Sequence, residues 1–75
     1  MRKHYYCWIV YHAGKAVKHL SMTLDVQAES PTERTVEARR LFLELVHRDR
    51  GIFKSNIITG AVVEVSSLSH EELSI

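Results

Sequence analysis

Cysteine is almost absent from this sequence, since Cys7 is the only thiol among 75 residues. A single cysteine excludes a disulfide within the chain and every zinc site built from several cysteines. It also suits a reducing compartment. We therefore expect a cytoplasmic protein.

Long apolar runs are missing too. No run approaches the roughly 18 residues of a membrane-spanning helix. The apolar stretch from Tyr5 to Val10 follows Arg2 and Lys3, but it is too short for the hydrophobic region of a signal peptide. We expect neither secretion nor membrane insertion.

No charge of one sign dominates. Ten Lys and Arg against nine Asp and Glu give a formal net charge of +1, whereas a nucleic-acid-binding domain is usually clearly basic. Bulk charge therefore favours no class of partner. A local basic cluster, formed by Arg48, Arg50 and Lys54, leaves nucleic acid as an alternative partner.

The composition itself is that of a globular protein, with 45% hydrophobic and 25% charged residues. The length allows one domain, residues 1–75, with a thin core. A core of this size rarely supplies more than about 3–5 kcal/mol, and such domains often gain stability by self-association. We therefore expect a homo-oligomer or a complex with another protein.

Residues 4–12 are rich in aromatic and β-branched types, and Gly14-Lys15 follows as a two-residue type II′ turn. In this register Ala13 pairs with Ala16. Residues 20–26 then alternate between apolar and polar side chains. The pattern predicts a β-hairpin, and its apolar face carries Tyr5, Cys7, Ile9, Leu20, Met22, Leu24 and Val26.

A helix is predicted from Ser30, which can cap it together with Glu33, to about Arg50, where Gly51 suits the left-handed end. Pro31 fits the first helical position. At 100° per residue, one face gathers the apolar side chains expected to meet the sheet. These are Ala38, Leu41, Phe42, Leu45 and Val46.

Residues 57–65 are β-branched and predict a third strand. If Glu64 points to solvent, the inward residues are Ile57, Ala61, Val63 and Val65, with Thr59 as a misfit and Gly60 as a candidate bulge. The tail, residues 66–75, is polar and expected to fray.

These elements predict an α+β fold of ββαβ topology. A right-handed crossover through the helix brings the third strand beside the first, which gives a three-stranded sheet of order 2-1-3 with the helix on one face. The first strand is then central, in agreement with its apolar character on both sides.

The opposite face of this sheet carries more apolar surface than a solvated face needs. Aromatic side chains there can dock a second protein or a second copy, or stack nucleic-acid bases with help from Lys18. A shifted register would instead bury them in the core. The predicted partner-binding residues are Tyr6, Trp8, Val10, His19, Ile58 and Val62.

A second, narrower stripe lies on the helix away from its predicted core face. Val36 and Leu43 are seven residues apart and Arg40 lies between them. The stripe can contact another helix, although two scattered aliphatic residues on a surface are also ordinary.

Catalytic and metal-binding patterns are lacking. His12 and His19 are diagonal neighbours in the predicted hairpin, but two ligands are too few for a metal site. Cys7 is expected to face Met22 rather than a base, and no Gly-rich phosphate loop is present. We expect no enzyme activity, cofactor, metal or small-molecule substrate.

The preferred hypothesis is a small non-enzymatic binding or regulatory module that acts through protein–protein contact. Many small proteins of this arrangement act by binding, phage-type accessory proteins among them, but fold analogy alone assigns no function. The alternative is a module that binds single-stranded RNA or DNA with the same face.

Overall fold

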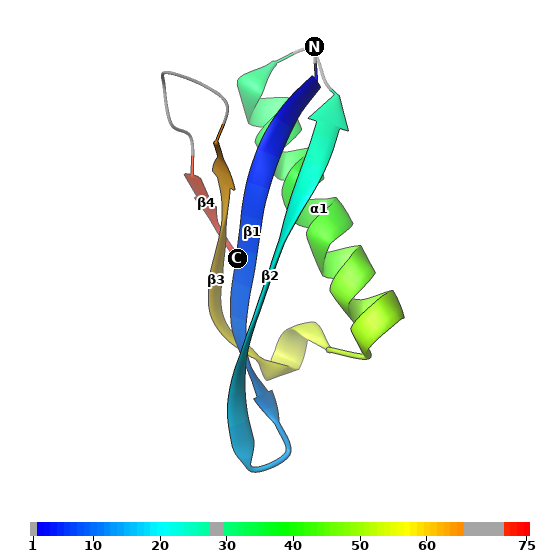
Figure 1. Ribbon diagram of the computed structural model, residues 1–75, viewed down its shortest axis with the longest axis vertical. Coiled ribbons are helices and arrows are strands. Elements are labelled where there is room, and N and C mark those ends of the chain that lie inside the picture. Colours follow the sequence, from blue (N-terminus) through cyan, green and yellow to red (C-terminus); the bar gives the residue numbers. More distant parts are fainter. Residues whose placement is uncertain (1, 28–29, 66–71) are drawn as a thin grey trace.

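The computed structural model describes residues 2–27, 30–65 and 72–75. One helix packs on one face of an antiparallel sheet, so the α+β class predicted from sequence is confirmed (Figure 1). In chain order the elements are β1 (Arg2–Ala13), β2 (Ala16–Gln27), α1 (Pro31–Arg50), the 3₁₀ turn η1 (Lys54–Asn56), β3 (Ile57–Glu64) and β4 (Glu72–Ser74).

The β1–β2 hairpin has the predicted register without a shift, from Ala13 opposite Ala16 to Cys7 opposite Met22 and Tyr5 opposite Leu24. Gly14 adopts φ 63°, which the first central residue of a type II′ turn requires. The turn lies beyond the ends of α1 and β3, at the bottom of Figure 1.

Both ends of α1 follow the signals in the sequence. The Ser30 side chain accepts a hydrogen bond from the Glu33 amide (3.1 Å), and Pro31 occupies the first helical position. Gly51 ends the helix with φ 66°, and its amide donates to the His47 carbonyl at 3.1 Å. Local capping chemistry therefore fixes where the helix begins and ends.

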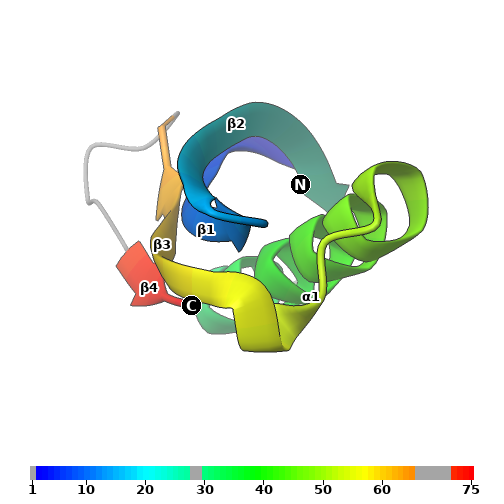
Figure 2. The same cartoon turned by 90° about the horizontal axis from the view of Figure 1, so that it is seen from below.

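The sheet has four strands in the order β2-β1-β3-β4, so the predicted three-stranded sheet of order 2-1-3 is wrong. The added strand, β4, lies in the segment expected to fray and pairs with residues 61–63 of β3. Residues 66–71 of that predicted tail lie outside the described residues. The strands curve around α1 (Figure 2).

Ile57 packs against the core as predicted, but after it the faces of β3 are the reverse of those predicted. Gly60, Val62 and Glu64 lie opposite Ile9, Cys7 and Tyr5, and therefore on the side of the sheet that faces α1. The cause is an irregularity between Ile57 and Thr59, where Ile58 is the extra residue of a bulge. A bulge of one residue exchanges the faces of everything after it.

The core lies between α1 and the middle strands. Its largest fully buried side chains include Tyr5, Ile9, Phe42, Val46 and Val62. The predicted helix face is buried at Ala38, Phe42 and Val46, whereas Leu41 and Leu45 remain half-buried.

Polar groups enter this core near the start of α1. Glu64 is 2% exposed, and its Oε1 lies 3.9 Å from Nη2 of the buried Arg34. The Tyr5 hydroxyl and the Thr35 hydroxyl are 3.3 Å apart and share a hydrogen bond. A carboxylate so deeply buried is tolerated because a cation is beside it.

Candidate functional site

The candidate site is the sheet face turned away from α1, called the outer face below. The β1–β2 register puts Tyr6, Trp8 and Val10 on it, because Cys7 and Ile9 between them belong to the core. His19 lies opposite Val10 on the same face. The remaining residues there, by register, are Arg2, His4, His12, Val17, Ser21, Thr23, Asp25, Gln27, Thr59, Ala61 and Val63.

The centre of the outer face is apolar and only partly exposed to solvent. Tyr6 is 37% exposed, while Trp8 and Val10 are half-buried. Ala61 lies opposite Trp8 and is 2% exposed. The indole ring of Trp8 stacks on the imidazole of His19, with ring centroids 6.2 Å apart and planes inclined by 24°. The Trp8 ring is therefore held in place on one side.

Two of the predicted partner-binding residues are placed differently from the prediction. Val62 is 0% exposed and belongs to the core, so its assignment to the outer face is wrong. Ile58 is 49% exposed, but it is the bulged residue of β3 rather than part of the regular face. The bulge brings Ala61 and Val63 onto the outer face in their place. A bulge position cannot be read from β-branched residues alone, so sequence reasoning missed both.

The outer face carries little charge. The outer face has no Lys or Arg within residues 4–12 of β1, 17–25 of β2 and 59–63 of β3. Asp25 is its one carboxylate in those ranges, and the His4 ring hydrogen-bonds to it across the strands. The site therefore offers stacking and apolar contact with few cations.

The predicted nucleic-acid contacts lie elsewhere. Lys18 pairs with Tyr11, on the other side of the sheet from Trp8. Arg48 and Arg50 are in the last turn of α1, and Lys54 begins η1, all three exposed. The structure does not bring this basic cluster onto the outer face, because α1 covers the opposite side of the sheet (Figure 1).

The second helix stripe lies on the flank of α1 next to the end of β4. Val36 and Leu43 line a groove of about 300 Å³ together with the last residue, Ile75. Arg40, between them, is held on its own helix by Glu37 and by Glu44, at 2.9 Å from the latter. Hydrogen bonding to Arg40 also lowers the pKa of Glu37.

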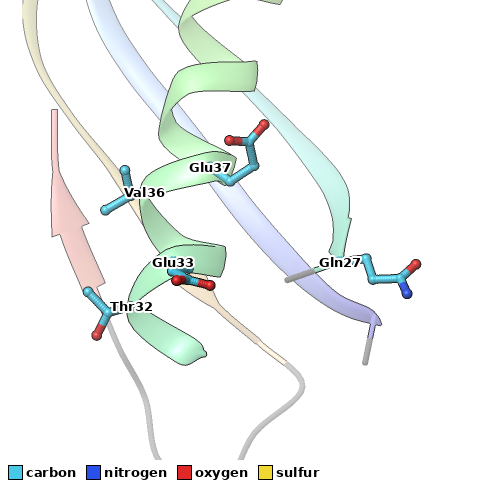
Figure 3. A pocket seen from close by; sticks show the side chains of 5 residues that line it. All are labelled: Gln27, Thr32, Glu33, Val36 and Glu37. Carbon is cyan, nitrogen blue, oxygen red and sulfur yellow. The ribbon is translucent and has the colours of Figure 1, made fainter. Parts of the chain in front are cut away.

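A larger hollow of about 530 Å³ lies at the N-terminal end of α1 (Figure 3). Thr32 and Val36 point to one side of the helix, Glu37 points to the other, and Gln27 comes from the end of β2. These side chains do not converge on a common point, as a general acid and base acting on one substrate must.

The single thiol is placed as predicted. Cys7 lies in the core opposite Met22 and is 0% exposed. Burial raises the pKa of the Cys7 thiol to about 12. A nucleophilic cysteine needs a lowered pKa and access to solvent, and Cys7 has neither.

No three His, Cys, Asp or Glu side chains among residues 2–27, 30–65 and 72–75 come close enough together to hold a metal ion. Within the same part of the chain, no helix is long and apolar enough to cross a membrane. Comparison with protein-family models, with curated proteins and with solved structures finds no match for this chain.

Proposed function

We propose that this chain is a non-enzymatic binding module whose outer face docks on another protein. The observation that carries the proposal is the sheet face left uncovered by α1, with Trp8, Tyr6 and Val10 at its centre. Half-buried aromatic rings of this kind supply large contact areas at low entropic cost, and such anchors dominate protein interfaces.

The charge of the face favours a protein over nucleic acid. Charge neutralisation of phosphates by Lys and Arg supplies most of the non-specific affinity for nucleic acid. Residues 4–12 of β1, 17–25 of β2 and 59–63 of β3 place no Lys or Arg on the outer face. Lys3 and Lys18 lie on the helix side of the sheet by register, and Arg48, Arg50 and Lys54 lie at the end of α1 or just after it. A single strand stacked on Trp8 would therefore find few cations near its phosphates.

The stack of Trp8 on His19 supports the same proposal. A ring that is held by a neighbour loses less rotational freedom on binding, and preorganised contacts of this kind gain affinity.

The experiment is a selection of peptides from a random library on the immobilised wild-type protein, with counter-selection on Trp8→Ala. We expect peptides rich in apolar and aromatic residues that bind the wild type at micromolar concentration and lose at least tenfold in affinity on Trp8→Ala. Their binding should change little with salt, because apolar docking releases few counterions.

Phe53→Ala is the matched control, because Phe53 is an exposed aromatic residue in the segment between α1 and β3, where it packs edge-on against His47. It should leave peptide binding unchanged. If no peptide distinguishes the wild type from Trp8→Ala, the proposal is wrong. If an oligonucleotide instead binds at submillimolar concentration, with affinity that collapses as salt rises, nucleic acid replaces protein as the partner.

A further inference from the structure

The strand β2 is a long and open edge of the sheet. It has twelve residues, pairs with β1 without a bulge, contains no proline, and has no described strand on its other side. The opposite edge, β4, has only three residues. Open edges present rows of unpaired backbone groups, and proteins usually shorten, bend or charge them. The edge at β2 has only Lys18 and Asp25 as charges in its length.

The hydrogen-bond alternation shows which residues of β2 face outward. The His4 carbonyl accepts the Val65 amide at 3.1 Å, so the backbone of His4 is turned toward β3. Antiparallel ladders alternate residue by residue, and Asp25 lies opposite His4. The odd-numbered residues of β2, from Val17 to Asp25, therefore direct N–H and C=O away from β1 and toward the open edge.

The core is also open along this edge. On β1 the core residues Tyr5, Cys7 and Ile9 are 0% exposed, whereas their partners on β2 are only half-buried. These partners are Leu24, Met22 and Leu20.

The helix continues the same apolar strip. Leu43 and Val36 lie near Ile75, on the β4 flank of α1. Leu41 and Leu45 lie on the opposite flank by helical spacing, and both are half-buried. Because the sheet order runs from β4 to β2, that flank faces the β2 edge. A strip of five half-buried apolar side chains thus follows the open strand.

We propose that β2 pairs antiparallel with β2 of a second copy, about a two-fold axis at Met22, to form one continuous eight-stranded sheet. Because the axis is perpendicular to the sheet, both helices lie on the same side of it. Residues of the two β2 strands that lie directly opposite each other then point to the same face of the joined sheet. In this register Leu20 lies opposite Leu24 of the second copy, so the apolar strips of the two copies meet.

The polar residues fit the same register. On the outer face Ser21 lies opposite Thr23 of the second copy, and His19 lies opposite its Asp25, each pair occurring twice. Hydroxyl pairs and other hydrogen-bonding polar pairs across strands are favourable. An axis at Ser21 would instead set Val17 against Asp25, whereas Lys18 lies opposite an apolar residue in both registers, Val26 for the axis at Met22 and Leu24 for the axis at Ser21. The partner of Asp25 therefore selects the axis at Met22 over its neighbour.

The proposal goes beyond the binding module inferred above and does not depend on it. Its partner is a second copy of this chain at an edge, whereas the outer face remains open for a different protein. Edge pairing would join the two outer faces into one surface, with a Trp8 on each half.

Static light scattering from one to tens of micromolar protein tests the pairing. We expect the wild type to approach twice its mass of 8.7 kDa. Thr23→Pro removes an outward amide without touching the ladder to β1, and should leave a folded monomer by circular dichroism. Thr23→Val is the matched control, since it retains the amide and the shape, and should remain a dimer.

A cross-link tests the axis directly, in a Cys7→Ala background. The two Met22 residues form a non-hydrogen-bonded pair with Cα atoms about 4.5 Å apart, which is within disulfide reach. Met22→Cys should therefore form a covalent dimer on air oxidation, and Leu20→Cys should not. The mixture of Leu20→Cys with Leu24→Cys should cross-link.

A wild type that remains monomeric at tens of micromolar would overturn the pairing. So would a dimer that persists in Thr23→Pro and shows no Met22→Cys cross-link. Trp8→Ala separates the two proposals, because it should weaken peptide binding at least tenfold and leave the dimer intact. If Trp8→Ala dissociates the dimer and Thr23→Pro does not, the copies meet through the outer face and the edge pairing is wrong.

Discussion

Substitution of Gly60 by alanine should put a methyl group where the backbones of β3 and β1 lie too close to accept one. Gly60 lies opposite Ile9, and a Cβ placed on it would be 2.5 Å from the Trp8 carbonyl oxygen and 2.8 Å from Cγ2 of Ile9. Ordinary contacts at such a position are 3.4–4 Å. The oxygen belongs to the backbone and cannot rotate away, so β3 has to move from β1.

The cost follows from that movement. Overpacking costs about 1–3 kcal/mol, and each lost ladder hydrogen bond adds about 1 kcal/mol. Replacing glycine by alanine within a strand stabilises the fold by about 0.5–1 kcal/mol, because alanine loses less backbone entropy on folding. With two such bonds lost, the net loss of unfolding free energy for Gly60→Ala is about 2–4.5 kcal/mol. A domain this small seldom has more than about 3–5 kcal/mol of core stability, so the variant should lose most of it.

The assay is urea denaturation followed by circular dichroism and Trp8 fluorescence. Gly51→Ala is the control, because its added methyl would meet nothing within 4 Å and only its positive φ is strained. That strain costs about 1–2 kcal/mol. If Gly60→Ala is as stable as the wild type, or less damaging than Gly51→Ala, then β3 does not approach β1 in the described register.

Three further predictions concern stability. Above pH 9 the wild type should lose about 1.4 kcal/mol of unfolding free energy per pH unit more than Cys7→Ala, because the unfolded thiol ionises near 9.0 while the buried one stays protonated to about 12. Equal slopes in urea titrations would place Cys7 in solvent. Glu64→Gln should cost about 3–5 kcal/mol of unfolding free energy by removing the carboxylate charge that lies 3.9 Å from Arg34 in the core, whereas Glu64→Leu with Arg34→Met should restore most of it in thermal melts. Ser30→Ala should lower the free energy of unfolding by about 1 kcal/mol, and Ser30→Asp should leave it almost unchanged, as measured by the same melts. Equal losses in the two variants would mean that the helix cap is unimportant.

The hairpin and the helix could be predicted because their signals are local. Gly14 determines the position of the turn. The alternation of apolar and polar side chains that begins at Leu20 agrees with the register that this turn gives to β1 and β2. Ser30 and Gly51 mark the two ends of α1 within a few residues of the bonds that they satisfy. Signals of this kind need no knowledge of what packs against the element.

The faces of β3 could not be predicted, because they depend on residues far away in sequence. Glu64 was predicted to point to solvent, but it is buried beside Arg34, which comes from the first turns of α1. The extra residue at Ile58 then shifts the alternation, and nothing in a β-branched run marks that position. As a result Val62 moved from the candidate site to the core.

The short strand β4 was missed for a different reason. Three residues show no periodicity, and Glu72–Ser74 pairs only because β3 offers an open side there. The position of Ile75 near Val36 and Leu43 likewise comes from the sheet rather than from any pattern in the helix.

The central place of β1 has a consequence for the order in which the chain folds. Its pairing with β2 closes through a two-residue turn and can form within microseconds. Its pairing with β3 joins Tyr5 to Glu64, with nearly the whole chain in between, and such distant contacts slow folding. During synthesis the hairpin therefore forms before β3, and the edge of β1 that pairs with β3 stays open until residues 57–64 have been made.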